Sequence, residues 1–354
     1  MTGVQTCALP IFYDSGDFAP LLDKAIALSD ASGYAARQKE SKDRGRLRGR
    51  GIAMFLEVSG GAPAEFGGIR FLDGVLELAT GGGSSGQSHE TVYKHLVAER
   101  LGIDPARVRL VQGDSDRVPR GGTSTASRTT IAVGAITVDS INKVIEKGRQ
   151  LAAEHFEASP ADIEYAKGSF RVAGTDRVVP LWQFGQALDT ASEVKVTPNF
   201  PNGCHIAEVE IDPDTGVVTP CRYTAVDDCG NILNHTLVEA QVHGGLVQGL
   251  GQVLFEHAVY DPDTGQLLTG SFMDYGIPRA DNLPEIRLGE HVVPCMTNPL
   301  GVKGVGEAGT TGALPTLMNA ILDALAPLGI EQLDMPATPE RVWRAIAGTR
   351  GSVA

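Results

Sequence analysis

Apolar residues recur along much of the chain at the spacing of amphipathic helices. Intervals of three and four residues place such side chains on one face of a helix. Thr338 followed by Pro339 is a favourable N-cap and first-turn pair, and Gly33 suits a C-terminal stop. The pattern predicts helices over residues 17–32, 89–101, 129–156, 236–256, 312–326 and 339–347.

Short apolar runs between these helices have the length and composition of strands. The sequence DPDTG at residues 212–216 separates two of them and predicts a hairpin turn, and a copy lies at 261–265. Both copies lack the ligand spacing of a calcium loop, so we expect plain turns. Strands and helices mix without strict βαβ alternation, which predicts an α+β fold. The predicted strands cover residues 51–58, 68–72, 75–79, 108–112, 206–211 and 217–226.

Two segments do not fit this alternation of elements. Residues 1–11 match the translation of a common sequencing-library adapter, so we exclude them from the fold and expect upstream sequence to be missing. Residues 41–50 are basic and interrupted by glycine, which predicts a solvated linker.

The composition is that of a globular protein with two or three domains or lobes, since 42% of its 354 residues are hydrophobic and 21% are charged. The net charge of −13 disfavours nucleic acid and anionic membranes as partners. No apolar run reaches the ~18 residues of a membrane span. The absence of a secretory signal predicts a cytoplasmic protein. The five cysteines form no C-x₂-C pair, which argues against a zinc or iron–sulfur site in this chain.

The most informative segment is GVKGVGEAG at residues 301–309, whose one acid is Glu307. Glycine allows a backbone to approach a bulky ligand closely. A lone carboxylate held in such a turn, away from bulk water, is suited to act as a general base. The alternative is an exposed Glu in a tight turn.

The same segment also fits the G-x-G-x-x-G fingerprint of a nicotinamide-dinucleotide fold, at Gly304, Gly306 and Gly309. That fingerprint opens a βαβ domain and needs a strand before it and an acid about 20 residues later. Two prolines precede it here, and too little chain follows for a Rossmann domain. We therefore disfavour this alternative.

Three further segments are small-residue loops with a few polar groups, at residues 86–91, at 123–129, and at 227–231 together with 241–245. The first two open predicted helices, whose N-terminal amides can bind an anion such as a phosphate. Each loop alone is compatible with an ordinary turn or cap. Together with the Glu307 turn, they indicate a large anionic cofactor held mainly by backbone.

The order of these motifs carries a specific resemblance. From about residue 12 to its end, the chain resembles the molybdenum-binding large subunit of the xanthine dehydrogenase/aldehyde oxidase family. The resemblance lies in the order of GQSHET, DDCGN with EAQVHGG, KGVGEAGT and MPATPERVW. Bacterial members related to the carbon monoxide dehydrogenase large chain are the most similar. The resemblance implies the molybdopterin-binding fold of molybdenum hydroxylases, with two mixed sheet/helix lobes and truncated at its N-terminus.

The resemblance also implies an activity and a site. The chain would be the C-terminal part of a subunit that hydroxylates an aldehyde, an N-heterocycle or a similar small substrate, with water as the oxygen source. Glu307 matches the family's base. Molybdenum would be held by molybdopterin, in its cytosine dinucleotide form, and not by protein side chains. The residues that match cofactor-binding positions are Gly86, Gln87, Ser88, His89, Ser124, Thr125, Ala126, Ser127, Arg128, Thr129, Cys229, Gln241, Lys303, Gly304, Val305 and Gly306.

The implied organisation extends beyond this chain. Residues 12–50 would be the tail of a first molybdopterin-binding domain and a linker, and 51–354 the second domain, with a lobe boundary near 170–200. FAD and [2Fe–2S] subunits would accept the electrons, in a dimer of heterotrimers when the protein is full length. Ala126 stands where a glycine is common in the family. We expect the chain alone to be inactive. A non-catalytic subunit that retains the fold is the alternative, against which Glu307 argues.

Overall fold

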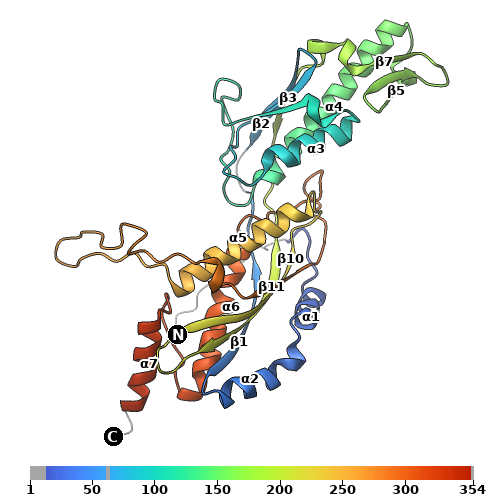
Figure 1. Cartoon of the computed structure of the whole chain (residues 1–354). Coiled ribbons are helices and arrows are strands. Elements are labelled where there is room, and N and C mark those ends of the chain that lie inside the picture. Colours follow the sequence, from blue (N-terminus) through green and yellow to red (C-terminus); the bar gives the residue numbers. More distant parts are fainter. Residues whose placement is uncertain (1–12, 61–63, 352–354) are drawn as a thin grey trace, which may run out of the picture.

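The computed structural model describes residues 13–60 and 64–351, which form two lobes (Figure 1). The predicted adapter-derived segment, residues 1–11, lies outside the described residues. The lower lobe is built on a four-stranded sheet of order β1-β9-β10-β11. β9 pairs antiparallel with both β1 and β10, whereas β10 and β11 are parallel. These strands are β1 (Leu47–Leu56), β9 (Asn202–Ile211), β10 (Val218–Asp228) and β11 (Glu285–Glu290).

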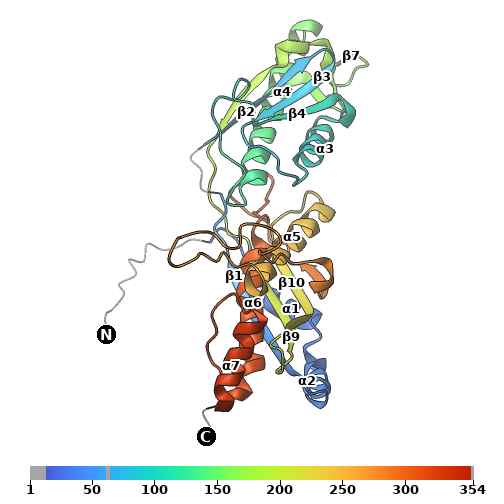
Figure 2. The same ribbon diagram turned by 60° about the vertical axis from the view of Figure 1, so that its left-hand side comes forward.

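Helices cover both faces of this sheet (Figures 1 and 2). Alternate residues of a strand point to opposite faces. On β9, Ala207 and Val209 belong to the core that α5 and α6 close, while Cys204 and Ile206 pack with α1 on the other face. The helices of this lobe are α1 (Phe18–Leu28), α2 (Tyr34–Asp43), α5 (His235–Leu254), α6 (Ala308–Leu325) and α7 (Pro339–Gly351).

Glycines let α6 lie directly against its neighbours. A Cβ on Gly51 of β1 would stand 2.0 Å from the carbonyl oxygen of Thr316 in α6. Where α5 crosses α6, a Cβ on Gly309 would stand 2.4 Å from the carbonyl oxygen of Val242, and Gly245 of α5 faces the same crossing. Glycine weakens an isolated helix, but Gly245 and Gly249 of α5 allow this close helix–helix contact.

The prediction of a solvated linker over residues 41–50 is wrong. Those residues include the end of α2 and the first residues of β1. The side chain of Arg48 is only 7% exposed, because it forms ion pairs with Glu208 (2.7 Å) and Glu210 (2.9 Å) of β9. Arg37 of α2 adds a second bond to Glu208 at 2.6 Å. Acids on the neighbouring strand therefore neutralise the basic segment and bind it to the lower lobe.

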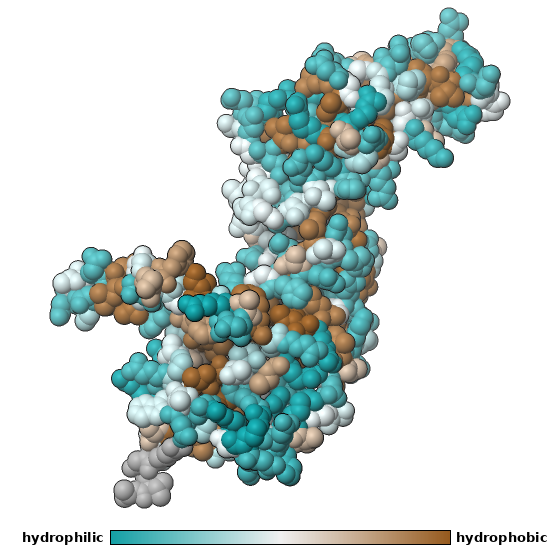
Figure 3. Space-filling view, viewed as in Figure 1, coloured by the Kyte–Doolittle hydropathy of each residue, from teal (hydrophilic) through white to brown (hydrophobic). Residues whose placement is uncertain are grey.

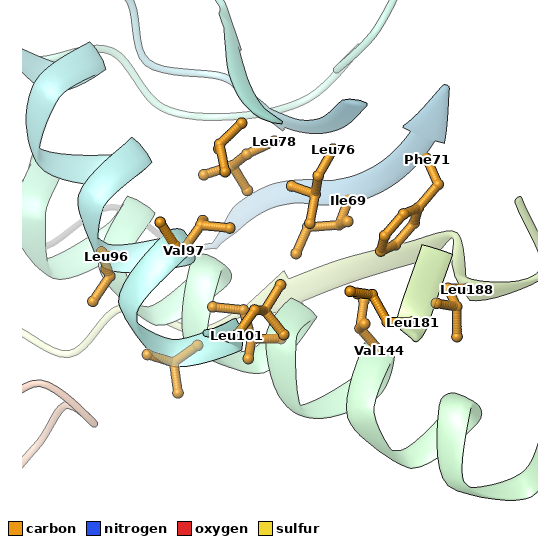
Figure 4. Close-up of a cluster of buried hydrophobic side chains, with 14 of the residues drawn as sticks. Ile69, Phe71, Leu76, Leu78, Leu96, Val97, Leu101, Val144, Leu181 and Leu188 are labelled. Atoms are coloured by element: carbon orange, nitrogen blue, oxygen red, sulfur yellow. The ribbon is translucent and has the colours of Figure 1, made fainter. Parts of the chain in front are cut away.

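The upper lobe carries a four-stranded sheet of order β4-β3-β2-β8 and a smaller sheet of order β5-β6-β7. Its core lies between the larger sheet and two helices, where Ile69, Leu76 and Leu78 meet Val97, Leu101 and Val144 (Figure 4). Its elements are β2 (Glu65–Leu72), β3 (Val75–Thr80), α3 (His89–Leu101), β4 (Val108–Gln112), α4 (Thr129–Phe156), β5 (Ile163–Ala166), β6 (Ser169–Val172), β7 (Val178–Pro180) and β8 (Thr190–Val194).

The chain leaves the lower lobe after β1 and returns to it before β9, so the lower lobe is discontinuous in sequence. The two segments that pass between the lobes, one after β1 and one before β9, are hydrogen-bonded to each other. Ser59 and Asn199 bridge through their backbones, and the Ser59 hydroxyl donates to the Asn199 side chain at 2.6 Å. Asn199 also donates to the carbonyl of Val302 at 3.1 Å. The two segments between the lobes are therefore hydrogen-bonded to the segment that leads to Glu307.

The segment between α5 and β11 extends away from the lower lobe (Figure 1). It exposes large apolar side chains, among them Phe272 at 84% and Met273 at 92%, and its surface is partly hydrophobic (Figure 3).

The predicted α+β class is confirmed, since helices and mostly antiparallel strands are mixed in both lobes. The predicted bounds of α3, β4 and α4 agree with the structure, and the turn at 212–216 closes through a bond from Gly216 N–H to the carbonyl of Asp212 at 2.8 Å.

Candidate functional site

A cleft of about 360 Å³ lies between the two lobes. The upper wall comes from the start of α3 and from the loop before α4; the lower wall comes from α5, its preceding loop and the segment before α6. All but four of the predicted site residues line this cleft. Those that do are Gln87, His89, Ser124, Thr125, Ala126, Ser127, Thr129, Cys229, Gln241, Lys303, Val305, Gly306 and Glu307.

The four others, Gly86, Ser88, Arg128 and Gly304, stand beside the cleft in sequence but do not line it. Arg128 is 3% exposed and pairs with Glu65 of β2 at 2.6 Å, so its guanidinium holds the loop and does not contact the cleft. Gly304 allows a close approach, because a Cβ there would stand 2.6 Å from Ser59 and Ser127.

The loop before α4 has an unusual backbone. Ala126 and Ser127 have φ of 51° and 49°, in the left-handed region that favours glycine. Glycine would adopt this conformation at position 126 without strain. The loop is also bound to the neighbouring one, since the Ser124 hydroxyl donates to the carbonyl of Gly83.

Three helices begin at this cleft. α3 starts at His89, α4 at Thr129 and α6 directly after Glu307, and each of these three residues lines the cleft. Across the described part of the chain, none of the three N-termini has a side-chain cap. The first N–H groups of a helix lack intrahelical partners and carry partial positive charge, so they suit an anion. The cleft therefore fits a large ligand that bears phosphate groups.

Two side chains of the upper wall are already oriented. The carboxamide oxygen of Gln87 accepts from the backbone of Ser85 within its own loop, which leaves the NH₂ group for a ligand. His89 is 6% exposed and its Nδ1 lies 3.2 Å from the amide nitrogen of Gln112. Burial lowers the pKa of His89. Its contact with Gln112 of β4 holds the ring in the upper wall.

Buried polar pairs support the lower wall. The ammonium of Lys303 is 0% exposed and lies 2.6 Å from Asp228, so Lys303 can meet a ligand in the cleft only through its backbone. Asp228 also accepts from the backbone N–H groups of Gly230 (3.0 Å) and Val293 (3.1 Å). Burial, with Asp227 and Asp228 nearby, raises the pKa of Cys229 to about 12. A raised pKa favours the protonated thiol over the reactive thiolate.

Glu307 lies at the mouth of the cleft, and it is neither alone nor shielded. It is exposed, contrary to the expectation of a carboxylate held away from water. Its Oε2 lies 3.0 Å from the Ser127 hydroxyl, and that hydroxyl lies 2.7 Å from Oε1 of Glu57. The expectation of a lone acid was wrong because Glu57, distant in sequence, follows β1 into the same place.

Sequence reasoning missed Glu57, which stands at the end of a predicted strand and outside the glycine-rich segments that were singled out. It also missed the apolar part of the wall. Leu237 and Val238 precede Gln241 by four and three residues on α5, so helical spacing from Gln241 was an available signal. The aliphatic lining residues that it missed are Val92, Leu233, Leu237, Val238 and Val302.

The fold and the cleft define a class of protein. Residues 24–284 match the family model described as molybdopterin cofactor-binding domain, and the chain belongs to this family. Its fold matches that of Cu,Mo-CO dehydrogenase with a TM-score of 0.87 and 30% identity, over 96% of this chain and 46% of that one. Quinoline 2-oxidoreductase from Pseudomonas putida 86 matches with a TM-score of 0.85 and 29% identity, over 94% and 46%.

Curated relatives agree with the structures. The chain is 33% identical to the gamma subunit of the 6-hydroxypseudooxynicotine dehydrogenase complex of Paenarthrobacter nicotinovorans, over 98% of this chain and 46% of that protein. It is 31% identical to the carbon monoxide dehydrogenase large chain of Hydrogenophaga pseudoflava, over 94% and 45%. The chain thus spans about half the length of the curated relatives it matches. The predicted resemblance is confirmed, and the dinucleotide-dehydrogenase alternative is wrong.

Between residues 13–60 and 64–351, no three His, Cys, Asp or Glu side chains gather so that they could hold a metal ion. No helix in those same ranges has the length and apolar character that a membrane crossing requires.

Proposed function

We propose that this chain is the cofactor-binding part of the catalytic subunit of a molybdenum hydroxylase, which hydroxylates an aldehyde, an N-heterocycle or a similar small substrate with oxygen from water. The observation that carries the proposal is the convergence of three uncapped helix N-termini, two polar loops and Glu307 on one cleft. Residues 12–50 would then end the first molybdopterin-binding domain, and residues 51–354 would form the second.

Within this proposal, backbone groups hold the anionic part of molybdopterin. Among residues 13–60 and 64–351, no side chain caps the N-termini of α3 and α4, whose first residues line the cleft, which suits the diphosphate of the cytosine dinucleotide form. The amide of Gln87 and that of Gln241 reach from opposite walls, where they can donate to pterin or diphosphate oxygens. The ion pair of Lys303 with Asp228 keeps the backbone at 303–306 in place beneath them.

The protein's chemical contribution is a proton acceptor. When bound, the molybdenum centre supplies the two-electron oxidation. Glu307 accepts a proton at its carboxylate, and its backbone N–H is anchored to the Ser127 hydroxyl at 3.0 Å, so its position is set before the substrate arrives. A general base of this kind contributes about 10²–10⁴ in rate. Electrons would leave to FAD and [2Fe–2S] subunits, in a dimer of heterotrimers.

The test is Glu307→Gln in the longer protein that contains this sequence. The amide keeps the size of the side chain and one oxygen that can accept from Ser127, but it cannot take up the proton. We expect full molybdenum content and a loss of turnover of at least about 10². Glu331→Gln, at an exposed acid of the lower lobe, is the matched control and should behave as the parent protein. Parent-like turnover in Glu307→Gln would remove the assignment of the base.

A further inference from the structure

We propose that Glu57, Ser127 and Glu307 form a proton-sharing relay that holds one proton at neutral pH, in which Glu57 is a positioning residue for Glu307. The role of this relay in catalysis rests on the proposed function, whereas the shared proton does not. The relay starts from three elements that are distant in sequence. Glu57 follows β1, Ser127 precedes α4, and Glu307 precedes α6.

The number of protons at Ser127 carries the argument. A hydroxyl has one proton to donate and two lone pairs to accept with. The backbone N–H of Glu307 donates to Ser127 Oγ at 3.0 Å and takes one lone pair. One donor and one lone pair are left for two carboxyl groups, at 2.7 Å (Glu57 Oε1) and 3.0 Å (Glu307 Oε2). Both contacts are hydrogen bonds only when one of the two carboxyl groups is protonated and donates to Ser127.

Burial favours Glu57 as the protonated partner. Its Oε2 is buried and has no hydrogen-bond partner within residues 13–60 and 64–351, whereas Glu307 is exposed. An unpaired charge is costly where water is excluded, so the proton is held where solvation is poorer. In agreement, the pKa of Glu57 is raised to about 7: burial is the largest cause, the bond with Ser127 opposes it, and the nearby Glu307 carboxylate adds to it.

Three basic side chains of the surrounding elements are engaged elsewhere. Lys303, from the segment before α6, is paired with Asp228 of β10 at 2.6 Å. His205 of β9 lies 3.1 Å from Asp227 of β10. Arg128, from the loop before α4, is paired with Glu65 of β2 at 2.6 Å. No ion pair involves Glu57 or Glu307 among the described residues, so a shared proton is the available means of reducing their repulsion.

The relay is balanced in atoms and charge. The O–H bond of Glu57 breaks as Ser127 Oγ gains that proton, and Ser127 gives its own proton to Glu307 Oε2; no electrons are transferred. With the proton on Glu57, Ser127 donates to Glu307 and fixes the carboxylate in its ionised form. Glu307 then meets the cleft as a base, and a proton that it takes up can leave to the solvent that reaches it.

The test uses the 354-residue chain labelled with ¹³Cδ-glutamate and a pH titration by NMR, without cofactor or substrate. We expect one carboxyl resonance with a midpoint near pH 7 in the parent chain. It should be absent in Glu57→Gln and unchanged in the control Glu331→Gln. In Glu307→Gln, loss of the neighbouring charge should move the midpoint down by about one pH unit.

A double-mutant cycle tests the role of the hydroxyl. Ser127→Gly removes it and tolerates the φ of 49°. If Ser127 is the relay, Glu307→Gln should move the Glu57 midpoint less in the Ser127→Gly background than in the parent. Equal shifts in both backgrounds, or no glutamate that titrates above about pH 5.5 in the parent chain, would overturn the inference. Either result would leave the molybdenum and turnover test of Glu307→Gln unaffected, so the two proposals can fail separately.

Discussion

The buried ion pair between Lys303 and Asp228 gives the sharpest prediction about stability. Both side chains are 0% exposed, and their charged atoms are 2.6 Å apart. Lys303→Met keeps the length of the side chain and removes its charge. Asp228 then remains buried with its backbone bonds to Gly230 and Val293 but without a counter-ion.

The expected cost follows from that uncompensated charge. Removing one partner of a buried pair lowers the free energy of unfolding by about 3–5 kcal/mol. Because Asp228 keeps two backbone donors and the amide of Asn202 at 3.3 Å, we expect the lower end, about 3 kcal/mol.

The chain contains a matched control. Lys39 and Asp43 form a pair of the same residue types at the same distance, 2.6 Å, but with side chains 76% and 62% exposed. Lys39→Met should cost less than about 0.5 kcal/mol, because solvent screens an exposed pair. The two variants thus differ chiefly in burial.

The assay is equilibrium unfolding in urea, followed by tryptophan fluorescence. The two tryptophans of the chain lie in different lobes, Trp182 in the upper lobe and Trp343 on α7 in the lower lobe. In a Trp182→Phe background, Trp343 therefore reports on the lobe that contains the pair. If Lys303→Met costs no more than Lys39→Met, the reasoning from burial is refuted.

Three more outcomes are expected. Gly51→Ala should lower the stability of the chain by about 1–3 kcal/mol, because its Cβ would stand 2.0 Å from the carbonyl oxygen of Thr316. The control Gly244→Ala has open space around it and should be neutral or stabilising. Equal melting temperatures of the two variants would contradict this. The pKa of Glu57 rises on folding from 4.5 to about 7, so the folded chain binds more protons than the unfolded chain in this pH window. The free energy of unfolding should therefore fall as pH rises from 4.5 to about 7. Urea titrations at several pH values should show this slope in the parent chain and its loss in Glu57→Gln. The purified 354-residue chain should neither retain molybdenum nor turn over, since it spans about half the length of its relatives. Stoichiometric molybdenum found by elemental analysis would contradict this expectation.

The periodic segments were predictable because their burial is decided locally. The apolar side chains of α4 repeat over seven turns, so its bounds, 129–156, follow from the sequence. The basic segment at 41–50 was misread for the converse reason. Its charges are neutralised by Glu208 and Glu210, which lie on a strand about 160 residues later, and no local pattern contains that pairing.

The sequence by itself determined which segments carry the chemistry. Glycines and small polar residues next to helix starts identify loops that can approach a ligand closely, and this property is local to the backbone. On that basis the sequence indicated the loops at 86–91 and 123–129 and the acid Glu307.

Only the tertiary structure decided which side chains of those segments contact one another and which stay exposed to solvent. It directed Lys303 and Arg128 into buried ion pairs, left Glu307 exposed at the mouth of the cleft, and brought Glu57 to the same hydroxyl. The physical reason is that charge interactions depend on distance and solvent exposure in the folded chain. These are set by how β1, α4 and α6 pack, and separation along the sequence does not encode them.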